Sequence, residues 1–163
     1  MGVGKTATGR IVADRLGRPF VDLDEVIQKR AGRTIREIFT HQGEHAFRDA
    51  EAAELERMTG RTELVVATGG GAFCSPANRE TIRRSGGISV FLDPPWEAIC
   101  LRLGGGHGSR PKWIDERHAR TLFLQRRPDY LLAEIHIELL GAESSAEVAD
   151  RVVAALTEAA CAS

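Results

Sequence analysis

The chain has 163 residues, of which 42% are hydrophobic and 28% charged, and its formal net charge is −1. This size and composition predict a single globular domain with its own hydrophobic core, and they argue against an intrinsically disordered chain. A nearly neutral charge offers no basic field for nucleic acid or a membrane surface, and no apolar run approaches the ~18 residues of a membrane span. The three cysteines are widely separated and lack C-x-x-C spacing. We therefore expect a cytoplasmic protein without disulfides or zinc, and without a nucleic-acid or membrane partner.

The first predicted element is a helix that begins at Thr6 and ends before Gly17, in a chain that opens MGVGKTATGR. Gly4, Lys5 and Thr6 match the second half of a phosphate-binding loop, G-x-x-x-x-G-K-[ST]. In such a loop, backbone N–H groups at a helix N-terminus bind phosphate oxygens, the lysine reaches the outer phosphates and the hydroxyl binds Mg²⁺. A match this short can arise by chance, but its position at the start of a helix favours the phosphate-binding interpretation.

A short strand at residues 19–21 leads into Asp22 and Asp24. Open α/β sheets gather their ligands at the carboxyl ends of the strands, and residues i and i+2 of an extended segment share a face. One carboxylate could therefore join a metal shell, while the other orients a substrate hydroxyl or acts as its base. The alternative is that Asp24 caps the helix that follows, DEVIQKR.

Two helices are predicted at residues 34–40 and 44–58, separated by a turn at residues 41–43. The second contains Arg48 within GEHAFRDAE. An exposed arginine among acidic residues is more often a salt-bridged surface residue. Only a nearby anion would give Arg48 a binding role.

An apolar strand at residues 64–67 runs directly into Gly69, Gly70 and Gly71. Three consecutive glycines carry a cost in chain entropy that a simple turn does not require. Close approach of a ligand to the backbone is therefore the favoured interpretation, and a tight turn is the alternative.

The second half of the chain continues the alternation of strands and helices. Its predicted elements are a strand at residues 88–92, helices at 96–103 and 115–127, a strand within 133–140 and a helix at 144–160. Strands that read as continuous apolar runs and alternate with helices predict a parallel sheet covered by helices on both faces. The first strand of that order is expected before Met1.

Three further arginines are candidates for anion binding. Arg110 follows the glycine-rich residues 104–108, as expected of a mobile lid that carries a cation to a transferring phosphoryl group; a stray arginine in a flexible loop is the alternative. Arg126 and Arg127 end a charged helix, where cations already favour the helix dipole, and one of them could also bind a carboxylate through its planar fork. The five histidines show no metal-ligand spacing, so none is predicted to bind a metal.

Six short motifs between Met1 and about Ala133 resemble, in their order along the chain, the motifs of the shikimate kinase family. They are G-V-G-K-T, D-L-D, G-E-x-x-F-R-x-x-E, T-G-G-G-A, R-P and R-x-P-x-Y. The resemblance implies an α/β P-loop fold of the nucleoside-monophosphate-kinase type, with a five-stranded parallel sheet flanked by helices, whose first strand would lie ahead of this sequence. It implies a single domain over residues 1–163, with a nucleotide-binding core, substrate-binding helices at about 23–60 and a lid at about 104–115. The implied reaction transfers the γ-phosphoryl group of ATP to the 3-hydroxyl of shikimate with Mg²⁺, in a monomer whose partners are these two small molecules.

The resemblance also implies which residues bind ATP. Lys5 would contact the outer phosphates, Thr6 would bind Mg²⁺, and Asp22 would support the metal through water. Arg110 would close over ATP with the lid, and Arg102 would stack on adenine. The residues implied to hold the phosphates are Gly2, Val3, Gly4, Lys5, Thr6 and Ala7.

A second set of residues is implied to bind shikimate. Asp24 would bind the reacting diol and assist removal of its proton. Arg48 and Arg126 would clamp the carboxylate, and the amides of Gly69, Gly70 and Gly71 would meet the ring hydroxyls. The implied catalytic residues are Lys5, Asp24 and Arg110.

Two alternatives stay open beside this interpretation. The chain could be a kinase of a related polyol or sugar acid such as gluconate, or a non-catalytic ligand-binding protein with an incomplete phosphate loop. The lid also departs from the family pattern, because it reads SRPKW where relatives have an apolar pair after Arg-Pro.

Overall fold

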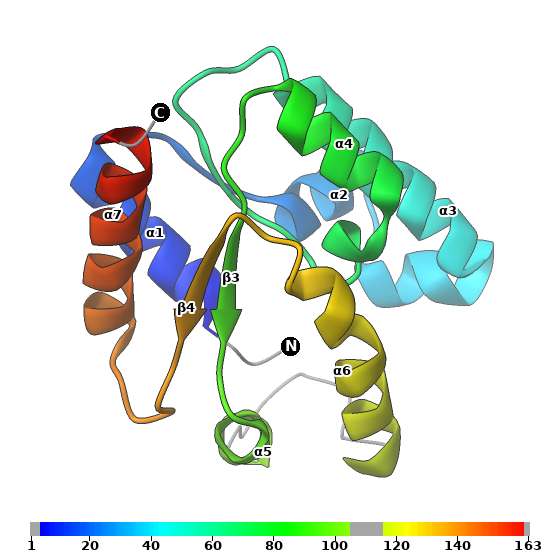
Figure 1. Ribbon diagram of the computed structural model, residues 1–163. Helices are drawn as coiled ribbons and strands as arrows, with labels where there is room; N and C mark the ends of the chain where they lie inside the picture. The colour runs from blue at the N-terminus through cyan, green and yellow to red at the C-terminus, as the bar shows by residue number, and fades with distance from the viewer. Residues whose placement is uncertain (1–3, 105–115, 162–163) are drawn as a thin grey trace.

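The computed structural model describes residues 4–104 and 116–161, without the side chains of residues 102–104, 116 and 118 (Figure 1). The elements in chain order are α1 (Lys5–Leu16), β1 (Phe20–Asp22), α2 (Leu23–Ala31), α3 (Ile35–Met58), β2 (Val65–Ala67), the 3₁₀ helix η1 (Ala72–Cys74), α4 (Pro76–Arg84), β3 (Val90–Asp93), α5 (Trp96–Gly104), α6 (Glu116–Tyr130), β4 (Ile135–Glu138) and α7 (Ser145–Cys161). Among these described helices, none has both the length and the apolar character that a membrane crossing requires.

The strands form two separate parallel pairs. β1 pairs with β2, and β3 pairs with β4. All four strands lie at the predicted positions, in segments rich in the β-branched and aromatic residues that suit a pleated surface. The resemblance implies five strands in one sheet, whereas the described residues provide four strands with a gap between β2 and β3.

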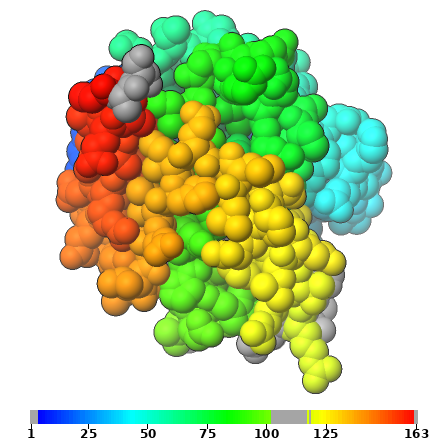
Figure 2. Space-filling view, viewed as in Figure 1, coloured from blue at the N-terminus to red at the C-terminus, as the bar shows by residue number. Residues whose placement is uncertain are grey.

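Helices cover both faces of the strands, as predicted. α1 and α7 pack together on one face, on the left in Figure 1, where Val65, Val90 and Leu92 join their core. α2 and α3 pack on the opposite face with Val66. Neighbouring side chains of a strand point to opposite faces, so Val65 and Val66 serve different cores. In the space-filling view, α7 (red) and α3 (cyan) accordingly form opposite sides of the molecule (Figure 2).

A cavity of about 620 Å³ lies in the gap between β2 and β3. Its wall includes residues of both strands and of helices α1, α4, α6 and α7. The same cavity reaches Lys5, Gly69, Gly70 and Arg126. The gap between the strand pairs therefore continues into the region that holds the predicted site residues.

The boundaries of α2 and α3 differ from the sequence predictions. The cap of α2 is Asp22, whose Oδ1 accepts hydrogen bonds from the N–H groups of Asp24 (3.0 Å) and Glu25 (3.4 Å). The alternative that Asp24 caps this helix is therefore wrong, because the extended backbone ends two residues earlier, at Asp22. The two helices predicted at residues 34–58 are joined into α3, with a kink at Gly43 (φ 82°, ψ 172°) where the turn was expected.

Two features of the second half depart from expectation. Sequence analysis predicts no helix at α4, although Ser75 caps it and Pro76 opens it, both of which are helix-start signals. The helix predicted to end at residue 127 continues through Pro128 to Tyr130. This extension matters because it places Arg126 and Tyr130 one turn apart on the same face of α6.

Candidate active site

The N-terminus of α1 meets the end of β1. The Thr6 hydroxyl donates a hydrogen bond of 2.7 Å to Asp22 Oδ2, while the other oxygen of that carboxylate is held by the start of α2. The first N–H groups of any α-helix lack an acceptor within the helix, which gives the N-terminus of α1 a preference for anions. Gly2 and Val3, also predicted here, lie outside the described residues.

The hydroxyl of Thr6 and the carboxylate of Asp22 form a pair of hard oxygen donors. Oxygen donors are what Mg²⁺ takes from proteins, and it usually binds one or two of them and keeps several waters. The local chemistry therefore fits the metal predicted from the sequence. Asp22 is also fixed in orientation by two backbone N–H groups.

The three consecutive glycines lie against the other predicted site residues. A Cβ on Gly69 would lie 3.0 Å from Asp24 Oδ1, and a Cβ on Gly70 would lie 3.6 Å from Arg126 Nη1. A Cβ on Gly71 would overlap the Arg48 guanidinium. The structure thus brings Asp24 from α2, Arg48 from α3 and Arg126 from α6 to one short segment after β2. Glycine is required here because side chains crowd the backbone.

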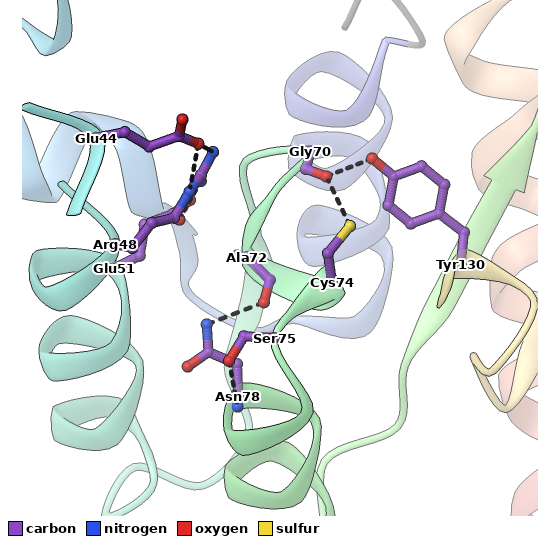
Figure 3. A network of polar contacts seen from close by, with 9 residues as sticks. All are labelled: Glu44, Arg48, Glu51, Gly70, Ala72, Cys74, Ser75, Asn78 and Tyr130. Atoms are coloured by element: carbon purple, nitrogen blue, oxygen red, sulfur yellow. Dashed lines mark hydrogen bonds and ion pairs between the residues drawn. The ribbon is translucent and has the colours of Figure 1, made fainter. Parts of the chain in front are cut away.

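Arg48 is held by two glutamates one turn away on α3. Its Nη2 lies 2.9 Å from Glu44 Oε1, and its Nη1 forms an ion pair with Glu51 (Figure 3). The Arg48 side chain is 31% exposed, whereas that of Glu51 is completely buried. The interpretation as a salt-bridged surface residue is therefore incomplete: Arg48 does form ion pairs, but these hold its guanidinium against Gly71.

Asp24 and Glu51 each carry a buried oxygen, Asp24 Oδ1 and Glu51 Oε1, with no hydrogen-bond partner among the described residues. Both oxygens lie close to Gly69. Burial raises the pKa of Asp24 above its ordinary 3.8, and the charge of Asp22 raises it further; Lys5 and Arg48 act in the opposite direction. Burial likewise raises the pKa of Glu51. This corner of the site offers unsatisfied acceptors to a ligand that carries hydroxyl groups.

The two neighbouring arginines of α6 have different surroundings. Arg127 forms an ion pair of 2.6 Å with Asp93 at the end of β3. Arg126 points instead to Gly70, and no carboxylate of the described residues forms an ion pair with it. Of the two arginines that sequence analysis offers for binding a carboxylate, Arg126 is the one at the glycine segment.

Tyr130 fixes the carbonyl side of the glycine segment. Its hydroxyl donates a hydrogen bond to the Gly70 carbonyl, which also lies 3.7 Å from Cys74 Sγ (Figure 3). Burial raises the pKa of Tyr130 to about 12, so the hydroxyl stays a donor at any ordinary pH. The buried Asn78 amide holds the next turn through a bond of 2.9 Å to the Ala72 carbonyl. The segment is therefore anchored from both α6 and α4.

Some site residues were missed by sequence analysis and others cannot be placed. Glu51 and Tyr130 were missed as site residues; their spacing of i+3 from Arg48 and i+4 from Arg126 places them on the same helix faces as those arginines but does not reveal their contacts. The side chain of Arg102 is not described, and Arg110 lies outside the described residues with most of the predicted lid.

Known proteins of one family resemble this chain. A family profile described as shikimate kinase matches residues 1–157. The chain belongs to the shikimate kinase family. A shikimate kinase of Symbiobacterium thermophilum is 43% identical over 137 residues, which cover 82% of this chain and 78% of that relative. The fold is that of the family as well, with an α/β P-loop architecture, and the family uses ATP as a substrate.

Of two similar solved structures, one is a shikimate kinase and the other shares only the fold with this chain. A shikimate kinase from Acinetobacter baumannii, solved in complex with shikimate, superposes with a TM-score of 0.87 at 36% identity and covers 97% of this chain and 89% of that one. A gluconokinase from Sinorhizobium meliloti superposes with a TM-score of 0.62 at 20% identity, over 97% of this chain and 87% of that one. The second likeness concerns the fold alone.

Proposed function

We propose that this chain is a shikimate kinase that transfers the γ-phosphoryl group of ATP to the 3-hydroxyl of shikimate, on the route to aromatic amino acids. One observation supports this most strongly. Two guanidinium groups from different helices, those of Arg48 and Arg126, and the carboxylate of Asp24 lie against three consecutive glycines. The two guanidinium groups suit an anion, and the carboxylate of Asp24 suits hydroxyl groups of the same small ligand.

ATP is assigned to the end of the site at α1. The first turn of α1 would hold the phosphates, and Lys5 would neutralise the outer ones. Thr6, and Asp22 through water, would hold Mg²⁺, which when bound neutralises charge that develops on the phosphates. Further ATP contacts are proposed for Gly2, Val3, Gly4, Ala7, Arg102 and Arg110.

Shikimate is assigned to the glycine segment. Arg48 and Arg126 would bind its planar carboxylate, for which a guanidinium fork is suited. The ring would lie against the glycines, whose amides would donate to its hydroxyls. Asp24 would accept the proton of the 3-hydroxyl as that oxygen bonds to the γ-phosphorus and the bond from phosphorus to the ADP oxygen breaks. A raised pKa makes Asp24 a stronger base for this step.

A panel of acceptors tests the proposed function. With ATP and Mg²⁺, we expect phosphorylated shikimate and ADP in equal amounts, and a higher kcat/KM for shikimate than for gluconate or other polyol acids. A chelator should stop turnover. Preference for gluconate would favour the sugar-acid alternative, and absence of both turnover and ATP binding by calorimetry would favour the non-catalytic one.

Gly71→Ala tests the contact between the glycine segment and Arg48. The added methyl overlaps the guanidinium, which is the far end of a flexible side chain, so the protein should fold with Arg48 displaced. Loss of one charge-assisted contact is expected to raise the shikimate KM about tenfold, with the ATP KM unchanged. Gly60→Ala is the matched control, because nothing lies within 4 Å of its added methyl. Equal shikimate KM values in the two variants would refute the placement of Arg48.

We also propose that the protein acts as a monomer in the cytoplasm. Within the part of the chain that the structure describes, Cys74 and Cys161 form no disulfide, which suits a reducing compartment. Light scattering of the purified protein would test the monomer directly.

A further inference from the structure

The glycine segment forms a β-turn. The Ala72 N–H donates a hydrogen bond of 3.2 Å to the Gly69 carbonyl, which closes a turn of four residues with Gly70 and Gly71 at its centre. Gly71 has φ −101° and ψ −20°, close to the values of about −90° and 0° for the third residue of a type I turn. A type II turn keeps the same closing bond and differs in the orientation of its central peptide group.

Glycine at position 71 makes the second orientation accessible. Reversing the peptide group between Gly70 and Gly71 rotates φ of Gly71 by about 180°, from −101° to roughly +80°. That value lies in the left-handed region, which glycine enters at no steric cost. The backbone alone therefore allows both orientations of this peptide group, and a neighbouring side chain is needed to select one.

Tyr130 holds the type I orientation. Its hydroxyl donates to the Gly70 carbonyl, which belongs to the central peptide group. Because a trans peptide group is planar, the N–H of Gly71 points the opposite way, away from Tyr130. In Figure 3, Tyr130 and Arg48 lie on opposite sides of Gly70. The Gly71 N–H is thus turned to the side of Arg48, and none of the described residues accepts a hydrogen bond from it.

The orientation of this peptide group decides what a ligand meets. In the type I turn the ligand meets a donor, the Gly71 N–H, whereas a type II turn would present the Gly70 carbonyl. Two buried acceptors without partners, Asp24 Oδ1 and Glu51 Oε1, already lie beside this segment. A ligand hydroxyl has one proton to donate and two lone pairs that accept. Beside two carboxylates, it therefore gains more from an N–H group than from a third acceptor.

We propose that Tyr130 is a positioning residue, which selects the type I turn and so makes the Gly71 N–H a donor to a hydroxyl of shikimate. The inference rests on the proposed function and deepens it, because it names what orients the glycine amide. The Tyr130 ring packs against Phe91, with ring centroids 5.2 Å apart, which fixes the hydroxyl in place. Arg126 lies one turn earlier on α6, so one helix positions both the guanidinium for the carboxylate and the N–H for the hydroxyl.

Tyr130→Phe tests the proposal, because it keeps the ring against Phe91 and removes only the hydroxyl. A crystal structure of the variant without substrates reads the turn directly, and we expect φ of Gly71 to change from −101° to roughly +80°. This result requires no activity, so a failure of the kinase assignment leaves it unaffected. Cys74→Ala is the matched control, because its Sγ lies 3.7 Å from the same carbonyl and is a weak donor. It should keep the type I turn and the wild-type shikimate KM.

Substrate binding gives the second measurement. Tyr130→Phe should raise the shikimate KM about tenfold, as expected for one lost hydrogen bond to the ligand, and leave the ATP KM unchanged. Calorimetry with shikimate analogues that each lack one hydroxyl separates a lost donor from general destabilisation. The preference of wild type for one of these hydroxyls should shrink about tenfold in the variant. A type I turn in Tyr130→Phe, a wild-type shikimate KM, or undiminished preferences for all hydroxyls would overturn the proposal.

Discussion

Replacing Asp24 with asparagine is expected to lower kcat by about 10²–10⁴-fold, the usual contribution of a general base. Asparagine keeps the shape and can still accept a hydrogen bond from the diol, but it cannot take the proton of the hydroxyl. The shikimate KM should therefore change much less than kcat. Steady-state kinetics with both substrates varied would show the difference, and a kcat close to wild type would remove Asp24 from the chemistry.

The same substitution should make the folded protein more stable at neutral pH. Burial raises the folded-state pKa of Asp24 above 3.8, so the folded state disfavours the ionised carboxylate. The contribution of Asp24 to stability is therefore fully present below pH 3.8 and is lost as the pH rises through the raised pKa. We expect Asp24→Asn to have the higher Tm at pH 7, with the difference shrinking as the pH falls toward 3.8.

The pH dependence of wild-type kcat/KM provides a second test of the raised pKa of Asp24. The kcat/KM should fall on the acidic side at a pH above that of an ordinary aspartate, because only the ionised carboxylate accepts the proton. A wild-type protein more stable than Asp24→Asn at neutral pH, or an acidic limb at the ordinary aspartate pKa, would contradict a buried base.

Arg126→Ala is expected to raise the shikimate KM by roughly 10- to 150-fold, which corresponds to the 1.5–3 kcal/mol of a hydrogen bond to a charged group. The ATP KM should stay unchanged, because Arg126 is assigned to the carboxylate of shikimate. Kinetics with each substrate varied in turn would separate the two effects.

Arg127→Ala provides the matched control, with the same change at the next residue of α6. Arg127 pairs with Asp93, whose side chain is 13% exposed, so its loss should lower Tm and leave the shikimate KM unchanged. If both alanine variants raised the shikimate KM equally, the carboxylate clamp would not depend on the position of Arg126.

Much of the fold was predictable because local signals agree with the tertiary structure. Three of the four described strands, β1, β2 and β3, are short apolar runs that lead into Asp22, the triple glycine and Asp93, and most helices begin and end at residues that favour those positions. Sequence analysis offered Asp24 as the alternative cap of α2, whereas the cap is Asp22; both residues are good caps, and only the end of β1 decides between them. α4 was overlooked although Ser75 and Pro76 mark its start.

Sequence analysis could predict in part which site residues lie close together in the fold. The carboxyl ends of neighbouring parallel strands lie at one edge, which brings Asp24 near the glycines that follow β2. The partners of these residues depend on which helix faces pack together. Helix spacing alone could not tell that Glu51 is buried under Arg48, that Tyr130 reaches the Gly70 carbonyl, or which of Arg126 and Arg127 turns to the glycines.

Calorimetric binding of shikimate and of its uncharged methyl ester, to wild type and to Arg126→Ala, tests the carboxylate clamp most directly. Wild type should bind the acid about 10- to 150-fold more tightly than the ester, since the ester removes the charge that the guanidinium groups recognise. In Arg126→Ala, this preference should shrink by about tenfold. A wild-type protein that binds acid and ester equally, or a variant that keeps the full preference, would contradict the assignment of the glycine segment and its two arginines to shikimate.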